Sequence, residues 1–147
     1  MSQAQPQNYA NHARMIPAFH FVALPILAMN LFWSVGQVVT TGLSFETLLA
    51  VGVALALVII ALCARLFALW AQDRVIRLEM RLKLTEVLSD ELKPRIGDLS
   101  TSQLVGLRFA SDAELPGLVG KVLEGSLSDQ KAIKQAITAW QEDHQRV

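Results

Sequence analysis

The fold is decided by two segments, AFHFVALPILAMNLFWSVGQVV at residues 18–39 and TLLAVGVALALVIIALCARLFALW at residues 47–70. No Lys, Arg, Asp or Glu occurs from Met15 to Phe45, and none occurs from Thr47 to Ala64. A helix of roughly 20 apolar residues crosses a bilayer core about 30 Å thick. Both segments reach that length, so the sequence predicts two transmembrane helices.

The composition agrees with this prediction. Of the 147 residues, 52% are hydrophobic and 18% are charged, whereas a soluble domain carries about 25% charged residues. The formal net charge is zero. A cleaved signal peptide is not favoured for the first segment, because the apolar run exceeds the usual ~7–15 residues and no small-x-small cleavage site follows it.

The connection between the segments, TTGLSFE at residues 40–46, is too short for anything but an antiparallel hairpin. Lys and Arg concentrate on the cytoplasmic side of membrane proteins. The connection has neither, whereas Arg14 precedes the first span and basic residues follow the apolar part of the second: Arg65, Arg74, Arg77, Arg81 and Lys83. We therefore expect both termini in the cytoplasm.

Polar side chains lie inside both predicted spans: His20, Asn30, Ser34, Gln37 and Arg65. Pro25 removes a backbone donor and predicts a kink near Phe21. An antiparallel register places His20 level with Arg65, and two interpretations stay open. The pair forms an ion path or anion site, or Arg65 extends to the headgroups while His20 bonds a backbone carbonyl.

Alternating steps of four and three from Ala50 mark one face of the second span, which passes through Leu57 and is otherwise lined with small residues: Ala50, Ala54, Ala61, Ala64, Ala68 and Ala71. Small residues let helices approach closely in lipid. The opposite face is bulky and suits lipid: Val51, Leu55, Val58 and Leu62. The first span is one partner for the alanine stripe, and a second copy of the chain is the open alternative.

The second helix is expected to leave the membrane without interruption, because no helix-breaking residue separates Trp70 from Leu88. Larger apolar residues continue the alanine stripe and resemble a short coiled-coil seam: Val75, Leu78 and Leu82. Three arginines share another face: Arg74, Arg77 and Arg81. They are candidates for contact with anionic lipid headgroups, the alternative being an ordinary solvated basic flank.

Residues 89–147 are polar and contain several helix start and stop signals, which predict three short helices in a small module. The helix signals are two capping boxes, a terminating glycine and a further N-cap: Ser100 with Gln103, Ser111 with Glu114, Gly125, and Ser128 with Asp129. The last helix is expected to run to Trp140. A module of this size is marginal alone, so we expect it to pack on the projecting helix or on another copy.

The sequence thus predicts an all-α protein in three parts. Residues 1–17 form a cytoplasmic N-terminal flank. Residues 18–88 form a transmembrane hairpin whose second helix extends into the cytoplasm. Residues 89–147 form a cytoplasmic helical module.

We expect no enzymatic activity, cofactor or metal, because no nucleophile has a base at a recognisable spacing. The three histidines, His12, His20 and His144, are scattered, and Cys63 is the single cysteine. No phosphate-binding glycine run is present. Nucleic-acid binding is not favoured either, because residues 89–147 hold seven Lys and Arg against nine Asp and Glu, a net charge of −2.

Four segments together resemble an uncharacterised bacterial family of small proteins with two predicted transmembrane spans: QNYANHARMIP, RLFALWAQDRVIRLEMRLKL, QLVGLRFASDAELPGLV and LSDQKAIKQAITAWQED. The resemblance covers nearly the whole chain, from Gln7 to Val147. It implies a location in the bacterial cell membrane. It supplies no activity, cofactor or catalytic residue.

Two functional hypotheses remain. The first is a membrane-anchored interaction or scaffolding protein, whose partners are the bilayer and either a second copy or an unidentified membrane or cytoplasmic protein. The second is a homo-oligomeric channel or transport element. Its polar lining would be Asn30, Ser34 and Gln37, which share one helix face at i, i+4 and i+7.

Overall fold

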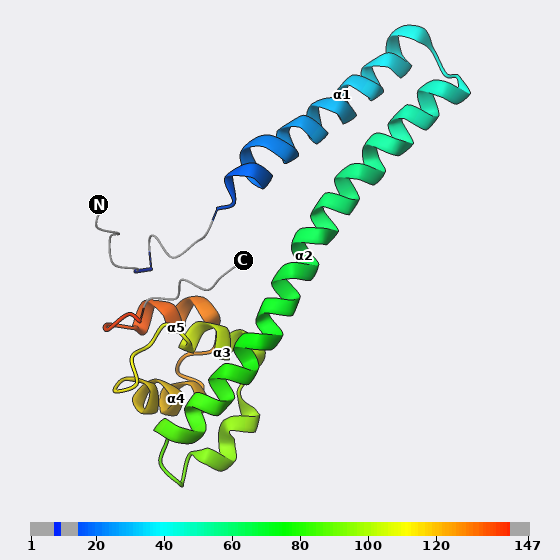
Figure 1. Ribbon diagram of the computed structural model, residues 1–147. Coiled ribbons are helices and arrows are strands. Elements are labelled where there is room, and N and C mark those ends of the chain that lie inside the picture. The colour runs from blue at the N-terminus through cyan, green and yellow to red at the C-terminus, as the bar shows by residue number, and fades with distance from the viewer. Residues whose placement is uncertain (1–7, 10–14, 142–147) are drawn as a thin grey trace. The chain divides into compact units, whose positions relative to one another are not determined.

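The computed structural model describes residues 8–9 and 15–141, and every regular element in them is helical (Figure 1). The elements comprise a π-helix, a 3₁₀-helix and five α-helices: η1 (Ala18–Ala23), α1 (Leu24–Thr41), α2 (Phe45–Val87), η2 (Lys93–Asp98), α3 (Thr101–Leu107), α4 (Leu115–Leu123) and α5 (Gln130–Ala136). The predicted all-α fold, with two long apolar helices and several short ones, is confirmed. Most of the N-terminal flank, including His12 and Arg14, and His144 lie outside the described residues.

The described residues fall into two compact units. Residues 15–69 form the hairpin unit, and residues 70–141 form the C-terminal unit together with Asn8 and Tyr9. The division between the units falls within α2, before the boundary at residue 88 that the sequence predicts. The last turns of this helix belong to the core of the C-terminal unit.

A widened helical turn precedes Pro25, in the segment around Phe21 where the sequence predicts a kink. Residues Ala18–Ala23 form the π-helix η1, and the Leu24 N–H donates to the Phe19 carbonyl. Proline is tolerated in the first turn of α1 because its missing N–H is not needed there. The π-helix absorbs the misfit that the proline ring would otherwise cause with the preceding turn.

The hairpin turn is held by local hydrogen bonds. Gly42 takes a φ of 90° at the end of α1, which favours glycine, and its N–H donates to the Val38 carbonyl at 3.0 Å. Ser44 then caps α2. Its hydroxyl accepts from the Thr47 N–H at 3.1 Å, while the Ser44 N–H donates to the Thr47 hydroxyl at 2.9 Å.

The apolar parts of both long helices are largely uncovered within the described residues. Ala18–Thr41 and Phe45–Val87 are each long and apolar enough to cross a membrane, and 6% of the most apolar window is buried in each. The core helix of a soluble protein is mostly buried, so this exposure is the opposite of what such a helix shows. With 43 residues, α2 is about twice as long in sequence as the roughly 20 residues that a bilayer core requires.

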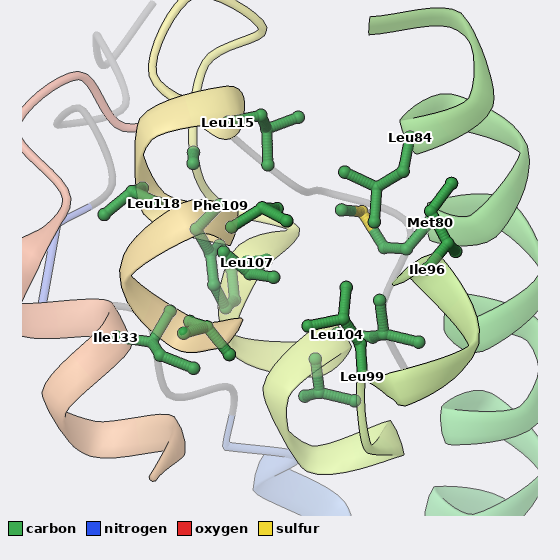
Figure 2. Packing of buried hydrophobic residues seen from close by; sticks show 14 of the residues in the cluster. Met80, Leu84, Ile96, Leu99, Leu104, Leu107, Phe109, Leu115, Leu118 and Ile133 are labelled. Atoms are coloured by element: carbon green, nitrogen blue, oxygen red, sulfur yellow. The ribbon is translucent and has the colours of Figure 1, made fainter. Parts of the chain in front are cut away.

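The C-terminal unit has a closed hydrophobic core to which every helix of the unit contributes (Figure 2). The end of α2 supplies a stripe at intervals of four: Ile76, Met80, Leu84 and Leu88. The short helices and loops supply the rest, and several of these side chains are fully buried: Leu104, Leu107, Phe109, Leu115, Val119 and Ile133. The module therefore packs on the end of α2, which is one of the two partners that the sequence predicts for it.

Helices α3 and α5 approach each other closely at Gly106. A Cβ built on Gly106 would lie 3.2 Å from Cγ2 of Ile133 and 3.4 Å from Cγ of Gln130. A Cβ at this position requires the Ile133 side chain to shift by a few tenths of an ångström, so the close approach favours glycine. Spacing along the sequence carries no signal of this requirement.

The capping signals were partly right. Ser100 and Gln103 form the predicted capping box, Asp129 caps α5, and Gly125 takes a φ of 81° after α4. The box at Ser111 and Glu114 is wrong. Glu114 itself occupies the N-cap position of α4 without a side-chain capping bond, and the Ser111 N–H donates to the Ala139 carbonyl at 3.1 Å.

The prediction that the last helix runs to Trp140 is also wrong. Helix α5 ends at Ala136, and Ile137 is extended with φ −74° and ψ 126°. Trp140 instead pairs with Ala110 in an isolated antiparallel β-bridge, and the Gln141 N–H donates to the Phe109 carbonyl at 2.7 Å. These long-range bonds satisfy the backbone, so a further helical turn is not needed.

Candidate interaction surfaces

The hydroxyl side chains of α1 bond to their own helix. Ser34 is buried, and its hydroxyl donates to the Asn30 carbonyl at 2.8 Å. The hydroxyls of Thr40 and Thr41 donate in the same way to the Gly36 and Gln37 carbonyls, at 3.0 and 2.7 Å. Such bonds satisfy a hydroxyl within an apolar environment without any partner helix.

Asn30 and Ser34 line a groove between the two helices of the hairpin, and Gln37 lies outside it. The groove has a volume of about 450 Å³, and its α2 wall contains Leu49, Ala50 and Val53. Gln37 lines a second groove of about 460 Å³ on α1, with Met29, Phe32, Trp33, Gly36 and Thr40. The polar residues at i, i+4 and i+7 therefore do not line one continuous path within a single chain.

His20 is engaged locally. Its Nδ1 lies 3.0 Å from the Ile16 carbonyl oxygen and 3.1 Å from the Ile16 nitrogen, and its ring meets that of Phe19 edge to face at 5.1 Å between centroids. Arg65 is half-buried on α2. The contact of His20 with the Ile16 backbone agrees with a structural role for the histidine.

The alanine stripe of α2 is divided between a covered and an exposed part. Ala54 is fully buried, and Ala61 and Ala68 are half-buried, whereas Ala50, Ala64 and Ala71 are exposed. Val51 and Val58, expected to face lipid, are half-buried, while Leu55 and Leu62 are exposed as expected. The covered side of α2 therefore contains both alanines and β-branched residues. This side does not coincide with the alanine stripe that the sequence spacing predicts.

The three arginines beyond the apolar part of α2 differ in exposure. Arg74 is exposed, whereas Arg77 and Arg81 are half-buried. The Nε atoms of Arg77 and Arg81 are buried without a hydrogen-bond partner in the described part of the chain.

Two contacts between distant residues tie the C-terminal unit together at its surface. Lys83 Nζ on α2 lies 2.6 Å from Asp112 Oδ1 and donates to Gln141 Oε1 at 2.7 Å. Glu114 accepts hydrogen bonds from the Thr138 hydroxyl and from the Thr138 and Ala139 N–H groups, the last at 3.0 Å. Sequence spacing cannot predict these contacts, because they join residues far apart in sequence.

The hydrogen bond from the Thr138 hydroxyl lowers the pKa of Glu114 below its ordinary value of 4.5. Partial burial acts in the opposite direction, and the backbone N–H groups of Ala139 and Thr138 add to the lowering. Glu114 is thus a charged clamp on the segment after α5. Its role is structural, because its oxygens are occupied by this segment.

A small pocket of about 210 Å³ lies on α5 and is lined by Tyr9, Gln130, Lys131 and Lys134. Lys134 Nζ also lies 5.2 Å from the centroid of the Phe109 ring, and Arg108 Cζ lies 4.6 Å from it. These cations cover the edge of the core. Within residues 8–9 and 15–141, no three His, Cys, Asp or Glu side chains gather in a way that would hold a metal ion.

These features define an all-helical protein with two helices long and apolar enough to cross a membrane, followed by a compact helical module. The whole chain, residues 1–147, matches a family of unknown function, DUF6526, and the protein belongs to that family. Comparison with curated proteins and with solved structures found no match.

Proposed function

We propose that this protein is a non-catalytic, membrane-anchored interaction protein of the bacterial cell membrane. The hairpin is the anchor, with both termini in the cytoplasm, and the module on the end of α2 is the part that interacts. One observation carries the proposal: the hairpin exposes its large apolar side chains, whereas the module buries its own. Contact of the apolar hairpin surface with water is unfavourable, whereas contact of the same surface with lipid is favourable.

The bulky residues of the hairpin illustrate the point. Phe32 is 78% exposed, Trp33 is 69% exposed and Ile60 is 62% exposed. A soluble monomer rarely exposes contiguous apolar surface on this scale. The charges begin where the apolar run of α2 ends, and the basic residues there agree with a cytoplasmic position.

The membrane placement is tested by reporter fusions and by fractionation. A periplasmic reporter enzyme fused after Val147 should be inactive, and one inserted at Leu43 in the turn should be active. The protein should remain in the pellet after an alkaline wash of the membranes. Activity of the Val147 fusion, or release of the protein by the wash, contradicts the proposal.

The interaction role is tested by crosslinking the full chain in intact cells before solubilisation. A defined complex should be recovered, and it should be lost when the module is destabilised by Phe109→Ala. Phe32→Ala, which changes an exposed hairpin residue, is the matched control and should keep the complex. Recovery of a monomer from the parent chain contradicts the role.

A channel lined by Asn30, Ser34 and Gln37 is the second candidate. The groove shared by Asn30 and Ser34 favours it, but the separate position of Gln37 and the bond from Ser34 to the Asn30 carbonyl do not. Ion flux into liposomes that falls on Asn30→Leu and Gln37→Leu would support a pore. Flux unchanged by both substitutions removes the reason for proposing one.

A further inference from the structure

Beyond the hydrophobic segment, α2 carries two apolar stripes, and the core uses one of them. Ile76, Met80 and Leu84 are at most 5% exposed. The second stripe, called here the outer stripe, consists of Val75, Leu78 and Leu82, which are 53%, 59% and 68% exposed. Three large apolar side chains uncovered on one helix face, next to a well-packed core, indicate a surface that meets a partner.

The outer stripe has the spacing of a coiled coil. Val75 and Leu82 take heptad position a, and Ala71 and Leu78 take position d. Counted back along the sequence, the same register places alanines at a and d: Ala61, Ala64 and Ala68. On a wheel of 100° per residue, the stripe used by the core lies roughly opposite this seam, so the module does not obstruct it.

The charged residues beside the outer stripe specify the partner. In this register Arg74 and Arg81 occupy g, and Glu79 and Glu86 occupy e. In a parallel two-stranded coiled coil, g of one helix faces e of the next heptad in the other helix. Arg74 then meets Glu79 of a second copy, and Arg81 meets Glu86, so both contacts join opposite charges.

The opposite orientation fails on the same residues. In an antiparallel pair, g faces g and e faces e, so Arg would meet Arg and Glu would meet Glu, and like charges repel. Two copies inserted in one membrane with the same topology can bring their second helices together only in parallel. The charge pattern and the shared insertion therefore favour one arrangement.

We infer that a second copy of this chain docks on the outer stripe and forms a short, parallel, two-stranded coiled coil just outside the membrane. The inference rests on the proposed membrane placement for the common orientation of the copies. It gives Arg74 and Arg81 a protein partner and sets the spacing of two interaction modules. Ala64 and Ala71, the exposed alanines at d, allow the helices to remain close toward the hydrophobic segment.

The test uses the full chain in native membranes, with Cys63→Ala as the background. A thiol placed at the seam by Leu78→Cys should give a disulfide-linked dimer on mild oxidation, because d side chains of parallel helices face each other. Ser102→Cys, an exposed position on α3, is the control and should give little dimer. Equal crosslinking at the two positions overturns the inference.

Charge exchange then tests the register. Arg74→Glu with Arg81→Glu should weaken the dimer about tenfold, and Glu79→Arg with Glu86→Arg should do the same. The four substitutions together restore opposite charges at every contact and should restore the Leu78→Cys crosslink. Weakening without restoration overturns the pairing, and so does a crosslink insensitive to either exchange.

Fractionation of the same samples separates this inference from the proposed function. Protein that pellets with the membranes and does not crosslink overturns the dimer and leaves the membrane placement intact. Protein that stays in the supernatant overturns the placement and, with it, the parallel arrangement drawn from common insertion.

Discussion

The hairpin and the C-terminal unit place large apolar side chains in opposite environments. In the hairpin, Ser34 and Ala54 are the buried residues in the described part, and most large apolar side chains are exposed. In the C-terminal unit, Phe109 and Leu107 are fully buried. The module therefore has its own hydrophobic core, whereas the hairpin leaves its apolar surface uncovered, as the proposed membrane anchor requires.

The largest effect is expected from the core of the module. Phe109→Ala removes a fully buried ring that stacks at 5.1 Å on Trp140 and should lower the free energy of unfolding by about 3–5 kcal/mol. Phe32→Ala in the hairpin removes a ring that is 78% exposed and should leave the module's unfolding unchanged. Denaturant unfolding of the solubilised protein, followed by tryptophan fluorescence, measures both. Equal losses of unfolding free energy in the two variants would contradict the contrast between the hairpin and the module.

A charge in the middle of the second span should affect the hairpin alone. Ile60→Arg places a cation at the centre of the span, which costs about 2.5–3.5 kcal/mol of insertion free energy. The fraction of protein in the membrane pellet should fall, while Ala113→Arg, on an exposed turn of the module, should not change it. Unchanged pelleting of the Ile60 variant would show that this side chain does not face lipid.

The Glu114 clamp predicts a pH dependence of the module. The pKa of Glu114 is lowered in the folded state, so its contribution is fully present above about pH 4.5 and is lost as the pH falls through the lower folded pKa. Glu114→Gln should cost about 1 kcal/mol near neutral pH, because one partner of charge-assisted hydrogen bonds is removed. It should also flatten the stability curve below pH 4.5.

Melting temperatures of the solubilised protein across pH 3–7 give this measurement. Glu124→Gln, at an exposed carboxylate at the end of α4, is the matched control and should follow the parent curve. A parent and a Glu114 variant that lose stability in parallel would show that the clamp is not the titrating element.

The smallest effect is expected from the ion pair of Lys83 with Asp112. The Asp112 side chain is 65% exposed, so the coupling should be about 0.2–1 kcal/mol and should shrink with added salt. A double-mutant cycle with Lys83→Ala and Asp112→Ala measures it. Coupling above this range would show that the pair holds α2 to the module more tightly than its exposure allows.

Sequence patterns predicted the structure correctly where the stabilising interactions join residues close together in sequence. The lengths of the two apolar helices, the capping box at Ser100 and the N-cap at Asp129 follow from composition and from hydrogen bonds that span three residues. The same reasoning failed at Glu114 and after Ala136. There, bonds to residues 24 or more positions away displaced the local preference.

The sequence by itself determined that two helices are apolar enough to cross a membrane, because length and composition are properties of each segment alone. Only the tertiary structure decided which stripe of α2 joins the core. Val75, Leu78 and Leu82 recur at intervals of three and four, and the buried stripe recurs at intervals of four. Both spacings keep residues on one helix face, so periodicity cannot decide which stripe is buried. The choice was made by the shape of the surface that α3, α4 and α5 present, and packing of that surface depends on residues distant in sequence.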